Sequence, residues 1–421
     1  MISLYATVLL VNLIQEPPSV SGPSLEWTRR TQGENVVSIE LVSRKYEVEG
    51  KPDLWLIGVA HVAEESFYEE VTILLDEMDI VLYESVRPAG SRPPSGSTDE
   101  ERVASTKKSL EFVADVAKKC AEETELIPET LEDVIADASL IDSRLSNFVE
   151  DASVDPWQRP FVLQVNPSTN EIIIWSFGSD GAIGGEDSAS DLTARRTVEI
   201  LDDESELSEE EEKVGLQAEF ADVLGLEFQL DVLPYEEPNW FCSDLTIDEV
   251  EAKLNALGAD ITILGTLTGE SFTAKIASGF MKLIPMLDSF TNGGARQTAK
   301  LLMIEMLSMP ESDKMLEGVQ PELAQVIIID RNTEVLKDIA ATLDVVENVS
   351  SIGVLYGAGH MSDLSPRLAT LFGYAPTEER WITAMSVNPK ESLLDEKYMR
   401  QMRAMLRLQL HNANKKKEET K

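Results

Sequence analysis

The fold is decided by two similar stretches, Leu54-Trp-Leu-Ile-Gly-Val-Ala-His61 and Ile352-Gly-Val-Leu-Tyr-Gly-Ala-Gly-His360. Each is an apolar run that leads to a glycine, and a histidine follows that glycine three positions later. Continuous apolar runs of this length are typical of strands that are buried on both faces of a parallel sheet. The chain has only three histidines, and two of them occupy this Gly-x-x-His setting. We therefore interpret the two runs as strands that bring two imidazoles to one site.

The residues around the first stretch predict a β-α-β unit. Alternation of apolar and polar residues over 36–48 predicts a strand, and residues 55–59 predict a buried one. Apolar residues at helical spacing follow over 64–78, and a second buried strand over 79–84 ends on Glu84. This order of elements predicts a parallel sheet.

The second half of the chain predicts further alternation of helices and strands. Apolar runs predict strands at 228–233, at 325–330 and at 351–356, the second of them ending just before Arg331. Helical spacing predicts helices at 214–224, 272–286, 295–309 and 364–371, and an amphipathic C-terminal helix at 396–410. The expected fold class is α/β (α+β), with a mainly parallel central sheet, flanking helices and a small α+β domain interrupting the core.

The composition limits the classes of function. Aspartate and glutamate number 76 against 36 lysines and arginines, which gives a net charge of −40. Because a chain with this negative charge repels nucleic acid, we expect no nucleic-acid partner. Its two cysteines, Cys120 and Cys242, provide neither a disulfide framework nor zinc spacing.

Two stretches of unusual composition indicate an inserted domain. Residues 88–97 are rich in Pro, Gly and Ser, and residues 201–212 carry eight acids. Between them lies a segment that reads as one helical region followed by hairpins and loops, as expected of a domain placed in a surface loop of another. The expected order is an apolar N-terminal segment, a first core part, a linker, an inserted domain, an acidic linker, a second core part and a C-terminal helix with a basic tail, at 1–22, 36–87, 88–101, 102–200, 201–213, 214–380 and 381–421 respectively.

The N-terminal segment bears on location. Residues 2–14 are mostly apolar, a length that suits a signal peptide better than a membrane span, yet no Lys or Arg precedes them. If this segment is a signal, we expect a periplasmic or secreted protein, and a cytoplasmic one if it is not. No later stretch is long and apolar enough to predict a transmembrane anchor.

Four side chains are expected at the C-terminal ends of predicted strands, where open α/β sheets bind ligands. They are His61, Glu84, Arg331 and His360. Two imidazoles and a carboxylate are a three-ligand set for a divalent metal of the Mn, Co or Zn type, and Arg331 could hold an anionic group or a developing oxyanion. The alternative is that a histidine at the end of a strand is structural. We place three further residues beside the site, namely Gly58, Gly357 and Asn332.

The motifs of the core resemble those of the TraB/PrgY/Tiki superfamily. The resemblance rests on Gly58-Val-Ala-His61-Val-Ala-Glu-Glu-Ser66, Asp79-Ile-Val-Leu-Tyr-Glu84, Ile329-Asp330-Arg331-Asn332 and Gly357-Ala-Gly-His360, in that order. It implies a fold related to the erythromycin esterase and ChaN group and a metal-dependent hydrolase site. In that site His61 and His360 match the Gly-x-x-His histidines, Glu84 matches the glutamate that ends a strand, and Arg331 matches the arginine. The membrane helices that end many members are missing here.

The inserted segment resembles the globular part of type II secretion major pseudopilins. Asp155-Pro156-Trp157-Gln-Arg-Pro160-Phe and Ile174-Trp-Ser-Phe-Gly178-Ser-Asp180-Gly-Ala-Ile-Gly-Gly185-Glu-Asp187-Ser-Ala-Ser-Asp191-Leu carry the resemblance. Its carboxylates and backbone carbonyls within a short arc are hard oxygen ligands that suit calcium, although such acidic loops are often simply solvated. The expected calcium-binding residues are Phe177, Asp180, Glu186, Asp187 and Asp191.

Two functions are therefore expected. The first is a metal-dependent hydrolase, with peptidase-like activity as one form, in which His61, Glu84 and His360 hold the metal and Glu84 and Arg331 take part in catalysis. The second is a non-catalytic protein that binds a peptide or small-molecule ligand, or that signals. In both, the pseudopilin-like domain could bind a protein partner.

Overall fold

The computed structural model describes residues 26–199, 221–259, 288–308 except 289 and 292, 321–345 and 349–394, and positions 398, 401 and 404. The apolar N-terminal segment, the acidic linker and the predicted helices at 272–286 and 396–410 lie outside these residues, apart from isolated positions of the last. The chain divides into two compact units. Unit 1 comprises positions 1–84, 210–233 and 252–421, and unit 2 comprises positions 85–209 and 234–251.

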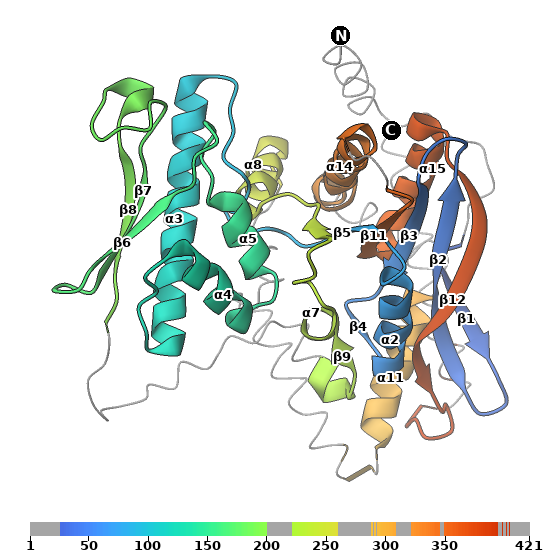
Figure 1. Cartoon of the computed structure of the whole chain (residues 1–421). Helices are drawn as coiled ribbons and strands as arrows, with labels where there is room; N and C mark the ends of the chain where they lie inside the picture. The colour runs from blue at the N-terminus through green and yellow to red at the C-terminus, as the bar shows by residue number, and fades with distance from the viewer. Residues whose placement is uncertain are drawn as a thin grey trace. The chain divides into compact units, whose positions relative to one another are not determined.

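Unit 1 is built on a mixed sheet (Figure 1). Its strands are β1 (Thr28–Gln32), β2 (Val37–Glu47), β3 (Asp53–Val59), β5 (Ile80–Tyr83), β11 (Ser351–Gly357) and β12 (Ala375–Val387). At the centre β11 lies between β3 and β5 and runs parallel to both. β12 pairs antiparallel with the whole of β2, whose other edge is shared by β1 and β3. The predicted α/β (α+β) class is confirmed, with a parallel centre and an antiparallel flank.

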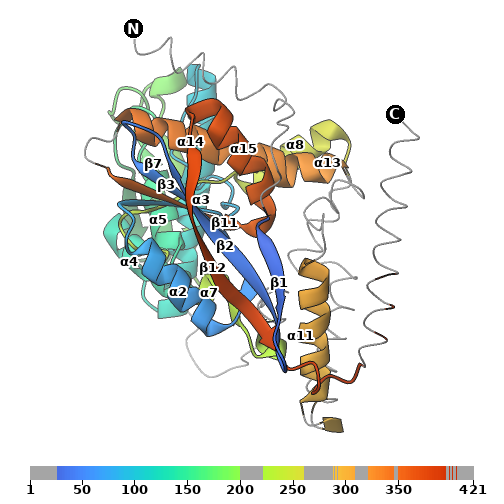
Figure 2. The same cartoon turned by 90° about the vertical axis from the view of Figure 1, so that its right-hand side faces the viewer.

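Helices cover both faces of this sheet, and strand alternation decides which residues meet which helix. The helices are α2 (Glu65–Leu75), α11 (Gly294–Leu307), α14 (Arg331–Val345) and α15 (Met361–Phe372). In β11, Ile352, Val354 and Tyr356 belong to the core cluster that packs against α14 and α15. Gly353 faces the other way, where a Cβ would lie 3.0 Å from Met78 Cγ, so glycine lets the segment after α2 approach the strand. Figure 2 shows α14 and α15 together, apart from α2 and α11.

Two predicted strands are wrong. Residues Gln325–Asp330 form a π-helical turn, η3, that joins α13 (Pro321–Ala324) to α14. Residues 228–233 are mostly α7 (Gln229–Val232), preceded by the two-residue strand β9 (Glu227–Phe228). Periodicity cannot separate a six-residue apolar run in a strand from one in a helix, and Pro321 is preset for the first turn of a helix. Arg331 therefore begins a helix and does not follow a strand.

In the mixed sheet of unit 1, β1 and β12 were not predicted, because much of their sequence is polar. β1 consists of Thr-Arg-Arg-Thr-Gln, and the first five residues of β12 are exposed. A strand with solvent along much of its length lacks the apolar alternation on which prediction depends. β12 also extends the core to Val387, beyond the boundary expected at residue 380.

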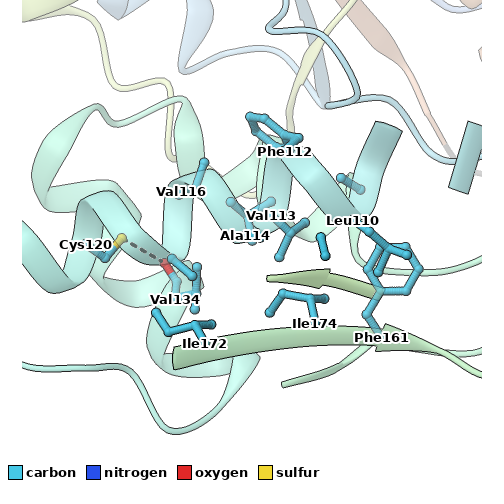
Figure 3. Close-up of a cluster of buried hydrophobic side chains, with 14 of the residues drawn as sticks. Leu110, Phe112, Val113, Ala114, Val116, Cys120, Val134, Phe161, Ile172 and Ile174 are labelled. Atoms are coloured by element: carbon cyan, nitrogen blue, oxygen red, sulfur yellow. Dashed lines mark hydrogen bonds between the residues drawn. The ribbon is translucent and has the colours of Figure 1, made fainter. Parts of the chain in front are cut away.

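Unit 2 packs three helices against a three-stranded antiparallel sheet. The elements are α3 (Asp99–Thr124), α4 (Leu131–Ile141), α5 (Leu145–Ala152), β6 (Val162–Asn166), β7 (Glu171–Ser176), η1 (Asp187–Ala189) and β8 (Leu192–Thr197), with β10 (Trp240–Cys242) further on. Figure 3 shows its core, where Leu110 and Val113 of α3 lie beside Ile174 of β7, and where Cys120 Sγ donates to Val134 O at 3.8 Å. The helix α8 (Ile247–Leu257) follows β10.

The segment expected as a linker at 88–101 packs against α3 in the structure. Ser91 is fully buried, and a Cβ on Gly90, whose φ is +78°, would lie only 2.3 Å from Lys108 O of α3. Asp99 already begins α3, so the last three residues of the expected linker are helical. The Pro, Gly and Ser residues here permit tight turns against a helix, which composition alone does not distinguish from a flexible tether.

None of the helices in the described parts of the chain is long and apolar enough to cross a membrane.

Candidate functional site

Three of the four predicted site residues follow the parallel strands of unit 1. His61 comes two residues after β3, Glu84 directly after β5, and His360 in the turn η4 (Ala358–His360) after β11. Since these strands are neighbours and parallel, their carboxyl ends lie at one edge of the sheet, as the sequence predicts. The fourth residue, Arg331, reaches the same place from the first turn of α14.

Glu84 is the centre of this group, which we call the Glu84 cluster: His61, Glu84, Arg331 and His360. Its Oε1 accepts a hydrogen bond from Arg331 Nη2 at 2.7 Å and lies 3.3 Å from His360 Nε2, and its Oε2 accepts from the Gly357 N–H at 2.6 Å. Burial raises the pKa of the Glu84 carboxyl, but the charges of His360 and Arg331 outweigh burial and hold that pKa well below its usual range. Glu84 is therefore a buried carboxylate that stays ionised.

His360 is fixed by a chain of polar contacts from two helices. Its Nδ1 lies 2.7 Å from Asn332 Oδ1. The amide nitrogen of Asn332 donates to His360 O at 3.0 Å and to Asp363 Oδ2 at 2.9 Å, which fixes Oδ1 as the acceptor. Nδ1 of His360 therefore carries a proton, and Nε2 is the nitrogen that faces Glu84. The ring also packs edge-on against Tyr356, at 5.2 Å between centroids.

His61 is held in a similar way by a residue that the sequence analysis missed. Its Nδ1 lies 3.0 Å from Gln229 Oε1, and the Gln229 N–H donates to His61 O at 2.9 Å. β4 (Val62–Ala63) pairs antiparallel with β9 and brings residue 229 to this position. No local motif marks Gln229, because 168 positions separate it from His61. Asp363 was missed because its contact with His360 runs through Asn332.

Gly357 is the point around which the cluster is arranged. A Cβ on Gly357 would lie 3.2 Å from Glu84 Oε2, 3.7 Å from His360 Cδ2 and 4.0 Å from His61 Nε2. A Cβ here would crowd Glu84 Oε2 and would touch both imidazoles at ordinary van der Waals distance. Gly58 has a different role, since its Cβ would lie 3.2 Å from Val42 O and 3.6 Å from Ala358. It allows close approach of β2 and the turn after β11.

The donor types of the cluster fit a divalent metal, although the ligands do not already converge. Among the described residues no three His, Cys, Asp or Glu side chains are grouped as a metal site. Two imidazoles and one carboxylate nevertheless surround Gly357, and each imidazole has its Nδ1 held by an amide oxygen. Histidines that bind metals generally have their other nitrogen held in this way. The residues therefore fit such an ion in chemistry and in the support of their side chains.

The predicted calcium residues lie in one closed loop of unit 2. Ser179 N donates to Ser188 O at 2.8 Å, and Asp191 N donates to Gly184 O at 3.2 Å. Asp191 Oδ2 accepts from the Gly184 N–H at 3.0 Å, whereas its Oδ1 is buried and has no hydrogen-bond partner among the described residues.

The other expected ligands precede Asp191 in the loop, and each is either hydrogen-bonded to a neighbouring residue or exposed. Asp180 Oδ1 accepts from Ala182 N at 3.0 Å, and Phe177 O accepts from Gly181 N at 3.1 Å. Glu186 and Asp187 are exposed, and Asp187 has a φ of +53°. A buried carboxylate oxygen without a donor is costly unless a cation binds it, so the loop fits a calcium ion best at Asp191.

Arg159 is a further loop residue that the sequence analysis did not single out. Its guanidinium donates to Gly178 O at 2.9 Å and to Ser179 O at 3.0 Å. Asp155 of the same motif accepts from the N–H groups of Trp157 and Arg159 through Oδ1, and from Ser176 Oγ through Oδ2. Asp155 therefore binds the end of β7, and Arg159 binds the loop that follows it.

Comparison with known proteins identifies one region. Residues 97–195 match the family model described as type II secretion system (T2SS), protein G. This match covers α3, the helices after it and the three-stranded sheet, and it supports the pseudopilin-like part of the predicted resemblance. No curated protein and no solved structure matches the chain.

Proposed function

We propose that unit 1 is a metal-dependent hydrolase of the TraB/Tiki type and that it carries a calcium-binding, pseudopilin-like domain. One observation carries the first part: both histidines have Nδ1 held by a side-chain amide oxygen, while His360 Nε2 lies 3.3 Å from Glu84 Oε1 and His61 Nε2 lies 4.0 Å from the position of a Cβ on Gly357. The resemblance of the core motifs to that superfamily supports the same reaction class. His61, Glu84 and His360 would hold the metal.

A bound metal would supply a water of lowered pKa and would polarise a carbonyl of the substrate. The chain's own residues have distinct tasks. Asn332 and Gln229 orient the imidazoles, and the Gly357 N–H and Arg331 keep Glu84 ionised and in place. Arg331 also puts a fixed positive charge beside the point where an oxyanion would form. The substrate class is a peptide or an ester.

Metal content tests this site. The His61→Ala/His360→Ala double variant should lose the metal that the wild-type chain binds stoichiometrically, as measured by inductively coupled plasma mass spectrometry after dialysis. His411→Ala is the matched control, because it removes the remaining histidine of the chain. Unchanged metal content in the double variant would show that this site is wrong.

The second candidate is a non-catalytic ligand-binding or signalling protein. It is favoured by the pairing of Glu84 with Arg331, whose side chains are only 6% and 7% exposed. Turnover of peptide and ester libraries with Mn²⁺, Co²⁺ or Zn²⁺ separates the two functions. Turnover that disappears in His61→Ala supports the hydrolase, whereas ligand binding without turnover supports the second candidate.

The pseudopilin-like domain points to a protein partner and to a location outside the cytoplasm. Its support is the match to a protein of a secretion system, together with a loop that fits calcium. A pull-down with the full chain and with a variant carrying charge reversals on the exposed sheet face of this domain tests the partner. Fractionation of cells that express the full chain tests the location.

Calcium should raise the melting temperature of the full chain. At a calcium concentration of 100 times Kd, binding to the native state adds about 2.7 kcal/mol to the free energy of unfolding. Asp191→Asn keeps the shape of the side chain but weakens the ligand, so it should remove most of the increase, and Asp180→Ala should do the same. An increase that persists in both variants would place the calcium elsewhere.

A further inference from the structure

Gln229 contacts His61 through both its backbone and its side chain. The Gln229 N–H donates to His61 O at 2.9 Å, and Oε1 lies 3.0 Å from His61 Nδ1. Gln229 is only 1% exposed, so water does not readily take the place of its side chain. The pairing of β4 with β9 sets the backbone contact, which in turn puts the amide within reach of the ring.

We propose that Gln229 is the positioning residue of His61 and that it holds the ring in its Nδ1–H tautomer. The amide oxygen can only accept a hydrogen bond, so the proton must lie on Nδ1 and the lone pair on Nε2. Nε2 is also the nitrogen closest to Gly357, 4.0 Å from the position of its Cβ. The inference rests on the proposed function in one respect only, namely that the Nε2 lone pair of His61 would bind the metal.

The arrangement at His360 supports this role. There Asn332 Oδ1 lies 2.7 Å from Nδ1, and its amide nitrogen is committed to His360 O and Asp363. The two histidines thus come from similar Gly-x-x-His turns and each has a carboxamide partner from a distant helix. Both partners are uncharged carboxamides whose oxygen accepts from the ring.

The test uses the full chain labelled with ¹⁵N-histidine, without metal, at about pH 8.5, well above the ordinary imidazole pKa of about 6.5. Long-range ¹H–¹⁵N spectra distinguish the two neutral tautomers. With three histidines in the chain, His61→Ala and His360→Ala assign the signals. His61 should be the Nδ1–H tautomer in the wild type, and His360 should carry a proton on Nδ1.

Variants separate positioning from folding. Gln229→Leu should change the tautomer signature of His61 and leave that of His360 unchanged, and Asn332→Leu should do the converse. Gln229→Glu keeps an acceptor oxygen and should retain the Nδ1–H tautomer. Metal affinity should fall about 10- to 100-fold in Gln229→Leu, as is typical when the partner of a ligating histidine is removed, and far less in Gln229→Glu.

Two results would overturn the inference. The first is an Nε2–H tautomer for His61 in the wild type. The second is an unchanged His61 signature in Gln229→Leu, in a variant whose unchanged His360 signal shows that it is folded. Failure of the proposed function looks different. In that case the tautomers and their response to Gln229→Leu are as expected, but added Mn²⁺, Co²⁺ or Zn²⁺ neither binds nor perturbs either imidazole.

Discussion

Glu84 illustrates what controls a buried charge at the residue scale. A buried carboxylate is unstable unless it is paired and hydrogen-bonded, and here one guanidinium, one imidazole and one backbone N–H supply that pairing. Removing one partner of such a pair typically costs about 3–5 kcal/mol, because it leaves the other charge alone. The pairing within the Glu84 cluster is therefore needed for the stability of the fold as well as for the proposed chemistry.

Spacing in the sequence was enough to predict which residues meet in this cluster, but not how they are held. His61 and His360 follow similar apolar runs, and Glu84 ends a third, so one topology places all three at one edge. Gln229 has no such signal. Its role depends on a two-residue strand pair between segments that lie far apart in the chain, and local pattern contains no information on that contact.

Asp142 of unit 2 should make the free energy of unfolding depend on pH in the acidic range. Burial raises the pKa of its carboxyl, but hydrogen bonds and charge from Arg144 outweigh burial and lower that pKa below its ordinary value. The contribution of Asp142 to the free energy of unfolding is therefore complete above the unfolded-state pKa, near 3.9, and is lost as pH falls through the lower folded-state pKa. Asp142→Asn should lose about 1–2 kcal/mol at neutral pH, and its deficit should shrink below about pH 4.

Urea unfolding of both proteins from about pH 7 down to about pH 3 measures this deficit, with Glu150→Gln on α5 as a control for the loss of one exposed negative charge. A deficit that stays constant over the whole range would mean that the Arg144 pairing does not act on the ionised carboxyl.

At the scale of elements, the long and strongly patterned segments were predictable and the short ones were not. The strands β2, β3 and β11 and the helices α2, α11 and α15 occur where alternation or helical spacing predicts them. The strand predicted at Gln325–Asp330 was wrong because an apolar run of six residues suits a helix as well as a strand. β1 was not predicted for the opposite reason: its residues are polar, and they form a strand because β2 pairs with them.

The N-terminus of α3 should contribute measurably to the stability of unit 2. Thr98 accepts from Glu101 N at 3.2 Å, and Glu101 Oε2 accepts from Thr98 N at 3.2 Å, which forms a capping box. Thr98→Ala leaves a backbone N–H without its acceptor and should lower the free energy of unfolding by about 1 kcal/mol, within a range of 0.5–2. Urea unfolding monitored by far-ultraviolet circular dichroism measures the loss.

Lys107→Ala is the control for this variant, because Lys107 is exposed on the same helix and alanine favours helix. Thr130 of α4 has the same capping arrangement with Asp133, so Thr130→Ala should cost a similar amount. Equal stability of Thr98→Ala and Lys107→Ala would show that the cap contributes nothing.

At the scale of the whole molecule, the division into two compact units does not follow the order of segments along the chain. Composition predicts one insertion between two parts of a core, whereas the structure assigns a second segment, 234–251, to unit 2. The short stretch of unit 1 that carries Gln229 therefore lies in sequence between two segments of unit 2. Membership of 234–251 could not be predicted, because its few apolar residues carry no pattern that assigns them to one core or the other.

The two cysteines test this division, because each marks a different segment of unit 2. Cys120 lies in the core of α3, where burial raises the pKa of its thiol to about 11. Cys242 packs against the same core, donates to Ser85 O at 3.1 Å, and has a thiol pKa raised by burial. Thiolates react and thiols do not, so both should label slowly at neutral pH in the folded chain.

Labelling of both should then follow the opening of unit 2. Thr98→Ala weakens that unit by about 1 kcal/mol, which corresponds to a factor of about 5 in the open population, and when opening is fast relative to labelling both cysteines should react about 5-fold faster. Labelling with iodoacetamide and mass spectrometry of the two peptides measures each rate. If only Cys120 accelerates, segment 234–251 does not open together with the rest of unit 2, and the division into these two units is wrong for that segment.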